Sequence, residues 1–287
     1  MKVLVAGGAG FVGLPTCRIL AERGHDVTVA SRTPDTAELP SQVETVALDV
    51  TDPDLTEAVS GHDAVVNLVA LPSHRDPRGR THESVHRDGT RNLVRASEET
   101  DVERFVQMSG LGVESDVDTA YFRAKRQAER IVRDSDLDWV VYRPSVVFGD
   151  GCAFLPFVER VTPPIFAPLP GGGTMELQPM WVEDLVPMLA DGVEDERRVG
   201  EIYELGGPER LTFAEIVERV NDGVSVVSVP NSLASVGFSV AERVPGVPFG
   251  RDQFRVFAAD NVVPSNDVTA FGVSEDDLRS LTDYLDK

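Results

Sequence analysis

The chain has 287 residues, 41% of them hydrophobic, and a formal net charge of −21. Its length suffices for a large core, and its negative charge argues against nucleic acids and anionic membranes as partners. We expect a reduced, cytoplasmic protein without a signal peptide, a transmembrane segment or a disulfide framework. The first residues lead straight into a strand, no apolar stretch is long enough to cross a bilayer, and the only cysteines are Cys17 and Cys152.

The basic residues are nearly all arginine, with lysine only at positions 2, 125 and 287. An acidic excess spread along a folded chain is typical of proteins that stay soluble at high salt, where ions screen the self-repulsion. We favour this halophilic-type interpretation. An ordinary acidic cytosolic protein is the alternative.

The first predicted strand, at residues 2–6, runs into a glycine-rich turn, and a helix follows from Leu14 to about Arg23. Residues 7–13 (GGAGFVG) fit two glycine patterns, Gly8-x-Gly10-x-x-Gly13 and Gly7-x-x-Gly10-x-x-Gly13. Glycines let the backbone approach a ligand, and the N-terminus of the helix attracts a pyrophosphate. A tight connection is the alternative, which the strand and helix on either side make less favourable. The predicted contacts are Gly7, Gly10, Phe11, Val12 and Gly13.

Strand and helix patterns then alternate. Strands are predicted at residues 26–30, 43–48, 64–69, 105–108 and 139–142, and helices at residues 53–60, 83–99 and 119–133. Repeated strand–helix units with short links indicate a parallel sheet covered on both faces. Right-handed crossovers make this α/β sheet doubly wound.

The pattern changes after Gly149, where prolines and glycines break up a loop-rich stretch. We predict a strand end running into a helix at residues 180–190, and strands at 202–205 and 224–229. A helix at residues 213–220 should be capped by Thr212, with Glu215 completing a capping box. The tail is expected to be mostly helical.

Ligands of doubly wound sheets bind outside the carboxyl ends of the strands. The second strand ends at Ser31 and Arg32, a hydroxyl and a cation that suit the 2′-phosphate of NADP(H) better than the ribose of NAD(H). A solvated loop arginine is the alternative. Asp49, after the third strand, could accept a hydrogen bond from the adenine amino group or simply form a turn.

Three more residues at strand ends, Val50, Val69 and Ala70, are expected in the cofactor site. Ser109 ends the fifth strand. Its hydroxyl could polarise a substrate carbonyl, or its small size could let the nicotinamide approach.

Tyr121 and Lys125 lie four residues apart on a predicted helix and therefore share one face. A nearby ammonium group should lower the pKa of the phenol towards the range of a general acid–base, and the lysine could also hold ribose hydroxyls. The alternative is an accidental surface pair. It is weakened because Lys125 is the only lysine between positions 2 and 287.

His82-Glu83-x-x-His86 fits a zinc-binding pattern. No later histidine offers a third ligand, and the motif lies on a crossover helix of the predicted sheet. We therefore expect no metal site and interpret the match as accidental.

With residues 7–13, Tyr121-x-x-x-Lys125 and residues 143–149 (RPSVVFG), the chain resembles the extended or atypical short-chain dehydrogenases/reductases, the NAD-dependent epimerase/dehydratase family. It looks most similar to the branch with the nucleotide-binding accessory subunit of respiratory complex I. The segments typical of that branch are residues 85–93 (VHRDGTRNL), 178–184 (QPMWVED) and 203–208 (YELGGP).

The resemblance implies a Rossmann fold in which the glycines cradle the pyrophosphate, Tyr121 exchanges the proton and Lys125 binds ribose. Pro144 and Val147 would contact the nicotinamide. The NAD(P)-binding domain would comprise residues 1–149 and about 174–206. A small substrate or partner lobe would comprise about 150–173 and 207–287.

Two residues depart from the family pattern. Leu111 stands where catalytic members carry Ser or Thr, and His86 stands where many carry Asn. The favoured function is hydride transfer by an NADP(H)-dependent oxidoreductase to or from the carbonyl or carbinol carbon of a small molecule. The alternative is a non-catalytic accessory or assembly protein that binds NADP(H) and a protein partner, including peripheral association with a respiratory complex. A sugar-nucleotide epimerase is disfavoured, because it needs tightly held NAD.

Overall fold

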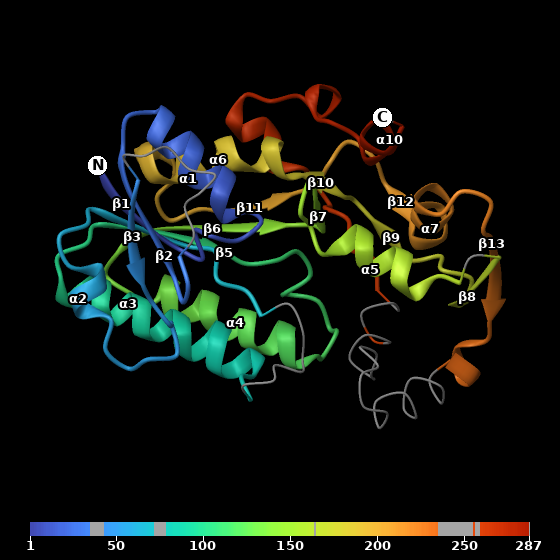
Figure 1. Ribbon diagram of the computed structural model, residues 1–287, viewed down its shortest axis with the longest axis horizontal. Helices are drawn as coiled ribbons and strands as arrows, with labels where there is room; N and C mark the ends of the chain where they lie inside the picture. The colour runs from blue at the N-terminus through green and yellow to red at the C-terminus, as the bar shows by residue number, and fades with distance from the viewer. Residues whose placement is uncertain (35–42, 72–78, 164, 235–254, 256–258, 287) are drawn as a thin grey trace.

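A seven-stranded parallel sheet forms the centre of the computed structural model, which describes residues 1–34, 43–71, 79–163, 165–234, 255 and 259–286 (Figure 1). The strand order is β3-β2-β1-β4-β5-β6-β11, and every neighbouring pair is parallel. The strands are β1 (Lys2–Ala6), β2 (Asp26–Ser31), β3 (Glu44–Ala47), β4 (Ala64–Asn67), β5 (Arg104–Met108), β6 (Asp138–Pro144) and β11 (Ile202–Leu205).

The order reverses between β1 and β4, so the carboxyl end of β1 lies at the switch point of the sheet. The central strands are apolar and buried along most of their length, as expected for a sheet with helices on both faces. The predicted doubly wound α/β fold is confirmed.

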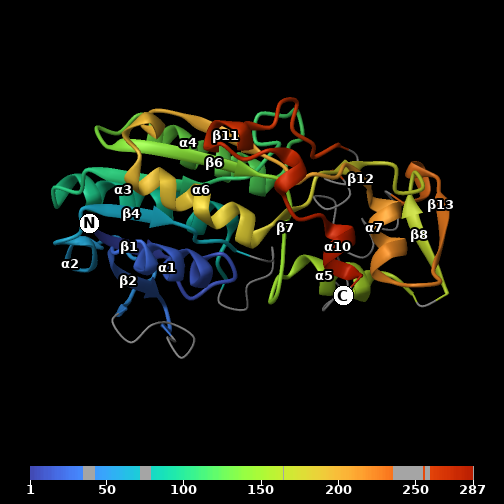
Figure 2. The ribbon, with the colours of Figure 1, turned by 90° about the horizontal axis from the view of Figure 1, so that it is seen from above.

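Helices cover both faces of the sheet (Figures 1 and 2). On one face lie α1 (Gly13–Glu22) and α6 (Val182–Glu194), and on the other α2 (Thr56–Val59), α3 (Gly89–Glu99) and α4 (Ala120–Arg133). The sheet buries one apolar cluster on each face. α4 begins where the Thr119 side chain accepts a hydrogen bond from the amide of Phe122 at 3.1 Å.

The helix predicted at residues 83–99 has two parts. It starts with a wide π-helical segment, η1 (Glu83–Asp88), and continues as α3. Propensity does not distinguish a π-helix from an α-helix, and π-helical turns are frequent at functional sites.

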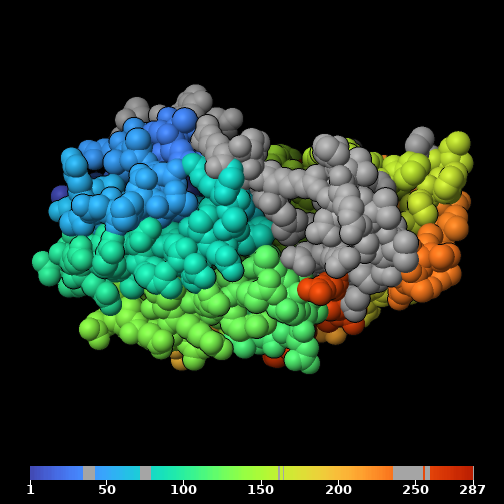
Figure 3. All heavy atoms as spheres, turned by 90° about the horizontal axis from the view of Figure 1, so that it is seen from below, coloured from blue at the N-terminus to red at the C-terminus, as the bar shows by residue number. Residues whose placement is uncertain are grey.

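A second, smaller unit lies beyond the carboxyl ends of β6 and β11 (Figure 2). It occupies one end of the elongated molecule (Figure 3). Its apolar cluster includes Phe148, Phe213 and Ile216. The capping box of Thr212 and Glu215 is present. The unit contains α5 (Phe154–Val161), α7 (Phe213–Val220) and α10 (Leu281–Leu285). Its strand pairs are β7 (Val147–Phe148) with β10 (Met180–Trp181), β9 (Glu176–Leu177) with β12 (Leu211–Thr212), and β8 (Phe166–Pro170) with β13 (Ser225–Val229).

Short helical pieces make up about half of the described part of the tail: residues 231–234, η3 (Asp267–Phe271), η4 (Glu275–Asp277) and α10. The tail does not lie wholly in the small lobe, as we expected, because Val268 and Leu278 pack into the cluster under α1 and α6. The rest of the proposed domain division stays a prediction.

Polar contacts attach this tail to the edge of the sheet. Asp267 accepts a hydrogen bond from the amide of Glu204 in β11 at 2.8 Å, and Asn266 bonds the backbone of Gly206 in both directions. The helices in the described ranges are all too short or too polar to span a membrane.

Candidate functional site

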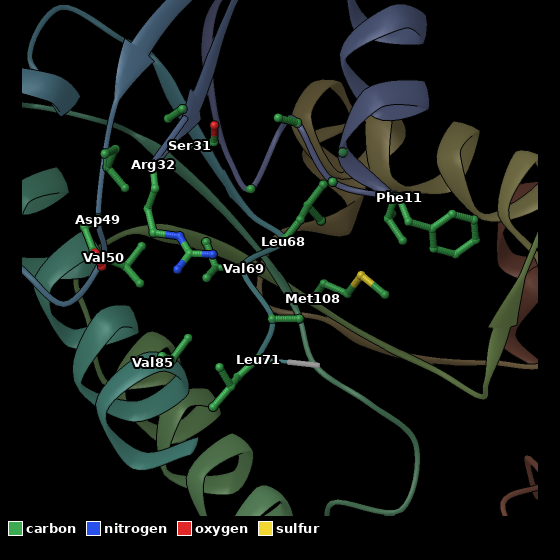
Figure 4. A pocket seen from close by; sticks show the side chains of 18 of the residues that line it. Phe11, Ser31, Arg32, Asp49, Val50, Leu68, Val69, Leu71, Val85 and Met108 are labelled. Carbon is green, nitrogen blue, oxygen red and sulfur yellow. The ribbon is translucent and has the colours of Figure 1, made fainter. Parts of the chain in front are cut away.

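A pocket of about 530 Å³ lies along the carboxyl ends of the central strands, at the switch point of the sheet (Figure 4). Most of the predicted site residues line it; Pro144 and Val147 do not. The predicted residues in its wall are Gly7, Gly10, Phe11, Val12, Gly13, Ser31, Arg32, Asp49, Val50, Val69, Ala70, Ser109, Tyr121 and Lys125.

Sequence reasoning missed other residues in the wall. Several of them, such as Leu48, Leu68 and Met108, end strands or follow them directly, so the rule about carboxyl ends could have found them. Arg80 carries no such signal, because it comes from the loop before η1. The missed residues are Ala9, Ala30, Thr33, Leu48, Leu68, Leu71, Arg80, Val85 and Met108.

The glycine-rich turn is closely packed on itself. Gly7 has φ +85°, and a Cβ at Gly13 would lie 2.2 Å from the carbonyl oxygen of Gly7. The amide of Gly10 donates to the same oxygen at 2.9 Å. The turn leads directly into α1, which begins at Gly13. Its backbone is therefore open to a ligand at the helix N-terminus, the arrangement that binds phosphate groups in proteins.

The end of β2 forms another part of the pocket wall. The Arg32 side chain points into the pocket, towards Val69 (Figure 4). The buried hydroxyl of Ser31 has no hydrogen-bond partner in the described structure. A buried polar atom without a partner costs free energy, so this hydroxyl is placed to bond a ligand.

Asp49 has partners within the protein. Its Oδ1 accepts hydrogen bonds from the amide and hydroxyl of Thr51, at 3.1 and 2.8 Å. Its Oδ2 forms an ion pair with Arg80. Asp49 therefore has the turn-forming role considered as the alternative; its contact with adenine stays a prediction.

Tyr121 and Lys125 meet at the pocket, where Nζ of Lys125 lies 6.0 Å from the centroid of the Tyr121 ring. Nζ donates to the carbonyl oxygen of Met108 at 2.9 Å. Burial lowers the pKa of Lys125 to about 8, although the charge of Glu129 acts in the opposite direction. Burial raises the pKa of Tyr121 to about 12, and Glu129 adds to this increase.

The expectation that Lys125 lowers the pKa of Tyr121 is therefore wrong for this structure. Loss of water around the phenol outweighs the attraction of an ammonium group whose own pKa is depressed by burial. At neutral pH the phenol is protonated.

Ser109 directly follows β5 and lines the same pocket as the Tyr121 phenol. A Cβ at the adjacent Gly110 would be 3.0 Å from the Tyr121 oxygen. The buried Ser109 hydroxyl, like that of Ser31, has no hydrogen-bond partner among the described residues. Leu111, at the position of the family's usual Ser or Thr, is buried, and its amide donates to the carbonyl oxygen of Pro144 at 2.9 Å.

The two histidines of the zinc-like motif pack behind Tyr121. The rings of His82, His86 and Tyr121 lie 5.5 Å apart in all three pairs. Burial, and then the positive charges of Lys125 and His82, lower the pKa of His86 to about 2. The motif thus lies beside the site. Within the described ranges there is no group of three or more potential metal ligands.

A buried ion pair holds α4 against β6. Arg143 donates to both carboxylate oxygens of Glu129, at 3.0 and 2.6 Å, and it also pairs with Glu114 and Glu204. The interaction with these carboxylates raises the pKa of Arg143 despite its burial. The ion pair between Arg143 and Glu129 therefore fixes α4, the helix that carries Tyr121 and Lys125.

A Rossmann sheet with a glycine-rich turn at its switch point defines an α/β protein of the nucleotide-binding class. Residues 7–151 match the model of a family described as NAD(P)H-binding. The chain belongs to this family, as an extended short-chain dehydrogenase/reductase related to the nucleotide-binding accessory subunit of complex I.

Curated relatives and solved structures agree with this assignment. The chain is 28% identical over 274 residues to the mitochondrial NADH dehydrogenase (ubiquinone) 1 alpha subcomplex subunit 9 of Arabidopsis thaliana, covering 90% of this chain and 68% of the relative. It is 29% identical to the 3 beta-hydroxysteroid dehydrogenase/Delta 5-->4-isomerase of Mycobacterium tuberculosis, covering 76% and 68% of the two chains. The X-ray structure of Pal from Bacillus thuringiensis superimposes with a TM-score of 0.76 at 20% identity, covering 100% and 97%.

Proposed function

We propose that the protein is an NADP(H)-dependent oxidoreductase that reduces a carbonyl group of a small molecule. One observation carries the proposal: Tyr121, Lys125 and the unpartnered Ser109 hydroxyl lie together in the wall of a pocket that also contains the glycine-rich turn and Arg32. The glycines would hold the pyrophosphate, Arg32 and Ser31 the adenosine end, and Lys125 the nicotinamide ribose.

When bound, NADPH supplies the hydride that converts a carbonyl carbon into a carbinol carbon. The Ser109 hydroxyl would donate a hydrogen bond to the carbonyl oxygen. Tyr121 would then give that oxygen its phenolic proton and recover one from solvent after the alcohol leaves. Because the pKa of Tyr121 is raised to about 12, the side chain holds the proton that reduction requires.

The test compares turnover with binding. NADPH oxidation with a panel of aldehydes and ketones should fall at least about 100-fold in Tyr121→Phe, the usual minimum contribution of an acid–base group. NADPH affinity by calorimetry should stay within about threefold. Tyr284→Phe removes a phenol that bonds Asp150 outside the pocket and serves as the matched control. Equal turnover in Tyr121→Phe and the wild type would refute the role of Tyr121.

A second candidate function is a non-catalytic accessory or assembly protein. Two observations favour it: the apolar Leu111 at the family's usual Ser or Thr position, and the likeness to a complex I subunit over 90% of the chain. In that case NADPH would raise the melting temperature, no carbonyl of the panel would be reduced, and Gly10→Asp would abolish both nucleotide binding and partner binding. Tyr121→Phe would affect neither.

A further inference from the structure

Arg80, three residues before η1, contributes a second cation to the pocket. Its guanidinium forms an ion pair with the Asp49 carboxylate at the end of β3. We propose that Arg80, oriented by Asp49, binds the adenosine 2′-phosphate of NADP(H) together with Arg32. The inference rests on the proposed dinucleotide site and adds a specificity-determining residue to it.

Asp49 lies on a closely fitted turn. Its Oδ1 is held by the amide and hydroxyl of Thr51. The carbonyl oxygen of the next residue, Val50, accepts a hydrogen bond from Nδ2 of the Asn92 side chain at 3.0 Å. A Cβ at Gly89 would lie 2.7 Å from Cγ2 of Val50, so the turn contacts the start of α3 without a gap. Asp49 therefore presents Oδ2 to Arg80 from a fixed position.

Arg80 is also placed by its neighbours along the chain. The amide of Thr81 donates to Oγ of Ser84 at 3.0 Å, and the amide of Ser84 donates to Oγ1 of Thr81 at 3.1 Å. This reciprocal pair fixes the start of the helix immediately after Arg80. The side chains of Arg80 and Asp49 are 14% and 25% exposed, so their ion pair lies at the pocket wall rather than out in solvent.

Charge and geometry identify the ligand. Among the residues that the structure describes, the charged side chains that line the pocket away from Lys125 are Arg32, Arg80 and Asp49, two cations and one anion. A guanidinium has five N–H donors in a planar fork, and such forks match phosphate geometry. A phosphate dianion is stabilised by each additional guanidinium, whereas a neutral ribose hydroxyl gains little from a second cation.

The experiment measures binding of NADP⁺, NAD⁺, 2′,5′-ADP and 5′-AMP to the full chain by calorimetry. Arg80→Gln should weaken NADP⁺ and 2′,5′-ADP about tenfold or more, the usual size of a charge-assisted hydrogen bond, and the other two ligands less than about threefold. Arg32→Gln should do the same. Arg197→Gln removes an exposed arginine that pairs with Asp195 outside the pocket, and it should leave the affinity for all four ligands unchanged.

An Arg80→Gln variant that weakens all four ligands equally, or none, would overturn the inference. A wild type that binds none of them would instead refute the proposed function. If Arg80→Gln does not fold, Arg80→Lys decides: it keeps the charge without the fork and should still lose at least about threefold in NADP⁺ affinity with NAD⁺ affinity unchanged.

The role of Asp49 has its own test. If Asp49 acts through Arg80, Asp49→Asn should change the ratio of NADP⁺ to NAD⁺ affinity in the wild type and leave it unchanged in the Arg80→Gln background. An equal change in both backgrounds would mean that Asp49 acts on the nucleotide directly, which would overturn its positioning role.

Discussion

At the scale of single residues, burial sets the protonation of the pocket. Lys125 is only 4% exposed, and its ammonium has one hydrogen bond to Met108 in place of water. Burial lowers the pKa of Lys125 and raises the pKa of Tyr121, because the loss of water disfavours both the ammonium ion and the phenolate. Near neutral pH the pocket thus holds a protonated phenol and an ammonium group poised to lose its proton. Both suit an anionic ligand.

Replacing Lys125 by Met should stabilise the nucleotide-free protein at pH 7 and remove its affinity for NADPH. Lowering the pKa from 10.5 to about 8 corresponds to roughly 3 kcal/mol of destabilisation by the buried charge. The lost hydrogen bond to Met108 offsets about 1 kcal/mol of the gain. We expect a net gain of about 1–2 kcal/mol in the free energy of unfolding, measured with urea. Arg130→Met, at an exposed position of the same helix, is the control.

The depressed pKa of Lys125 predicts that the stability of the protein depends on pH. The folded protein releases the Lys125 proton near pH 8 and the unfolded chain only near 10.5, so wild-type stability should rise between these values. The advantage of Lys125→Met should therefore shrink by pH 9.5. NADPH affinity of the wild type should begin to fall above about pH 8, as the ammonium loses its charge. A variant less stable than the wild type at pH 7 would contradict this account.

At the scale of elements, the glycine-rich turn has two roles, close packing within the fold and binding of the nucleotide, and substitutions can separate them. A Cβ at Gly13 would lie 2.2 Å from the Gly7 oxygen, whereas a Cβ at Gly10 has only that oxygen within 4 Å, at 3.1 Å. Gly13→Ala should destabilise the fold by about 1–3 kcal/mol through overpacking. Gly10→Ala should fold with a loss below about 1 kcal/mol and still weaken NADPH binding, because Gly10 lines the pocket.

Thermal unfolding and NADPH calorimetry of the two alanine variants check this separation. Gly10→Ala with wild-type affinity would show that the ligand does not approach this part of the turn. An unchanged melting temperature in Gly13→Ala would mean that the turn relaxes enough to accommodate a Cβ beside the Gly7 oxygen, which would contradict the expected overpacking.

The elements that sequence predicts well are those with local signals. The strands follow from short apolar runs, the turn from its glycines, and the helix start at Thr212 from its capping box. The ion pair of Asp49 and Arg80 joins two segments 31 residues apart, and nothing local marks it. The pKa of Tyr121 was predicted in the wrong direction, because spacing reveals a neighbour but not the depth of burial.

At the scale of the whole molecule, the charge of −21 predicts a response to salt. Screening shortens the range of the repulsion from about 10 Å at 0.1 M salt to below about 3 Å beyond 1 M. The melting temperature should rise by at least about 3 °C between 0.1 and 2 M KCl, as measured by calorimetry. The rise should be smaller at pH 5.5, nearer the sequence pI of about 4.5. A flat or falling melting temperature would contradict the halophilic-type interpretation.

The tail that lies along β11 determines when during synthesis the edge of the sheet can be covered. Asn266 and Asp267 bond an edge strand and loop made some sixty residues earlier, and Val268 closes the apolar layer below them. A nascent chain that has emerged only through β11 carries every strand of the sheet but leaves this edge exposed to water and to neighbouring chains. The nucleotide-binding half is thus finished by residues that the ribosome adds after most of the smaller unit, which makes the two halves dependent on each other during biosynthesis.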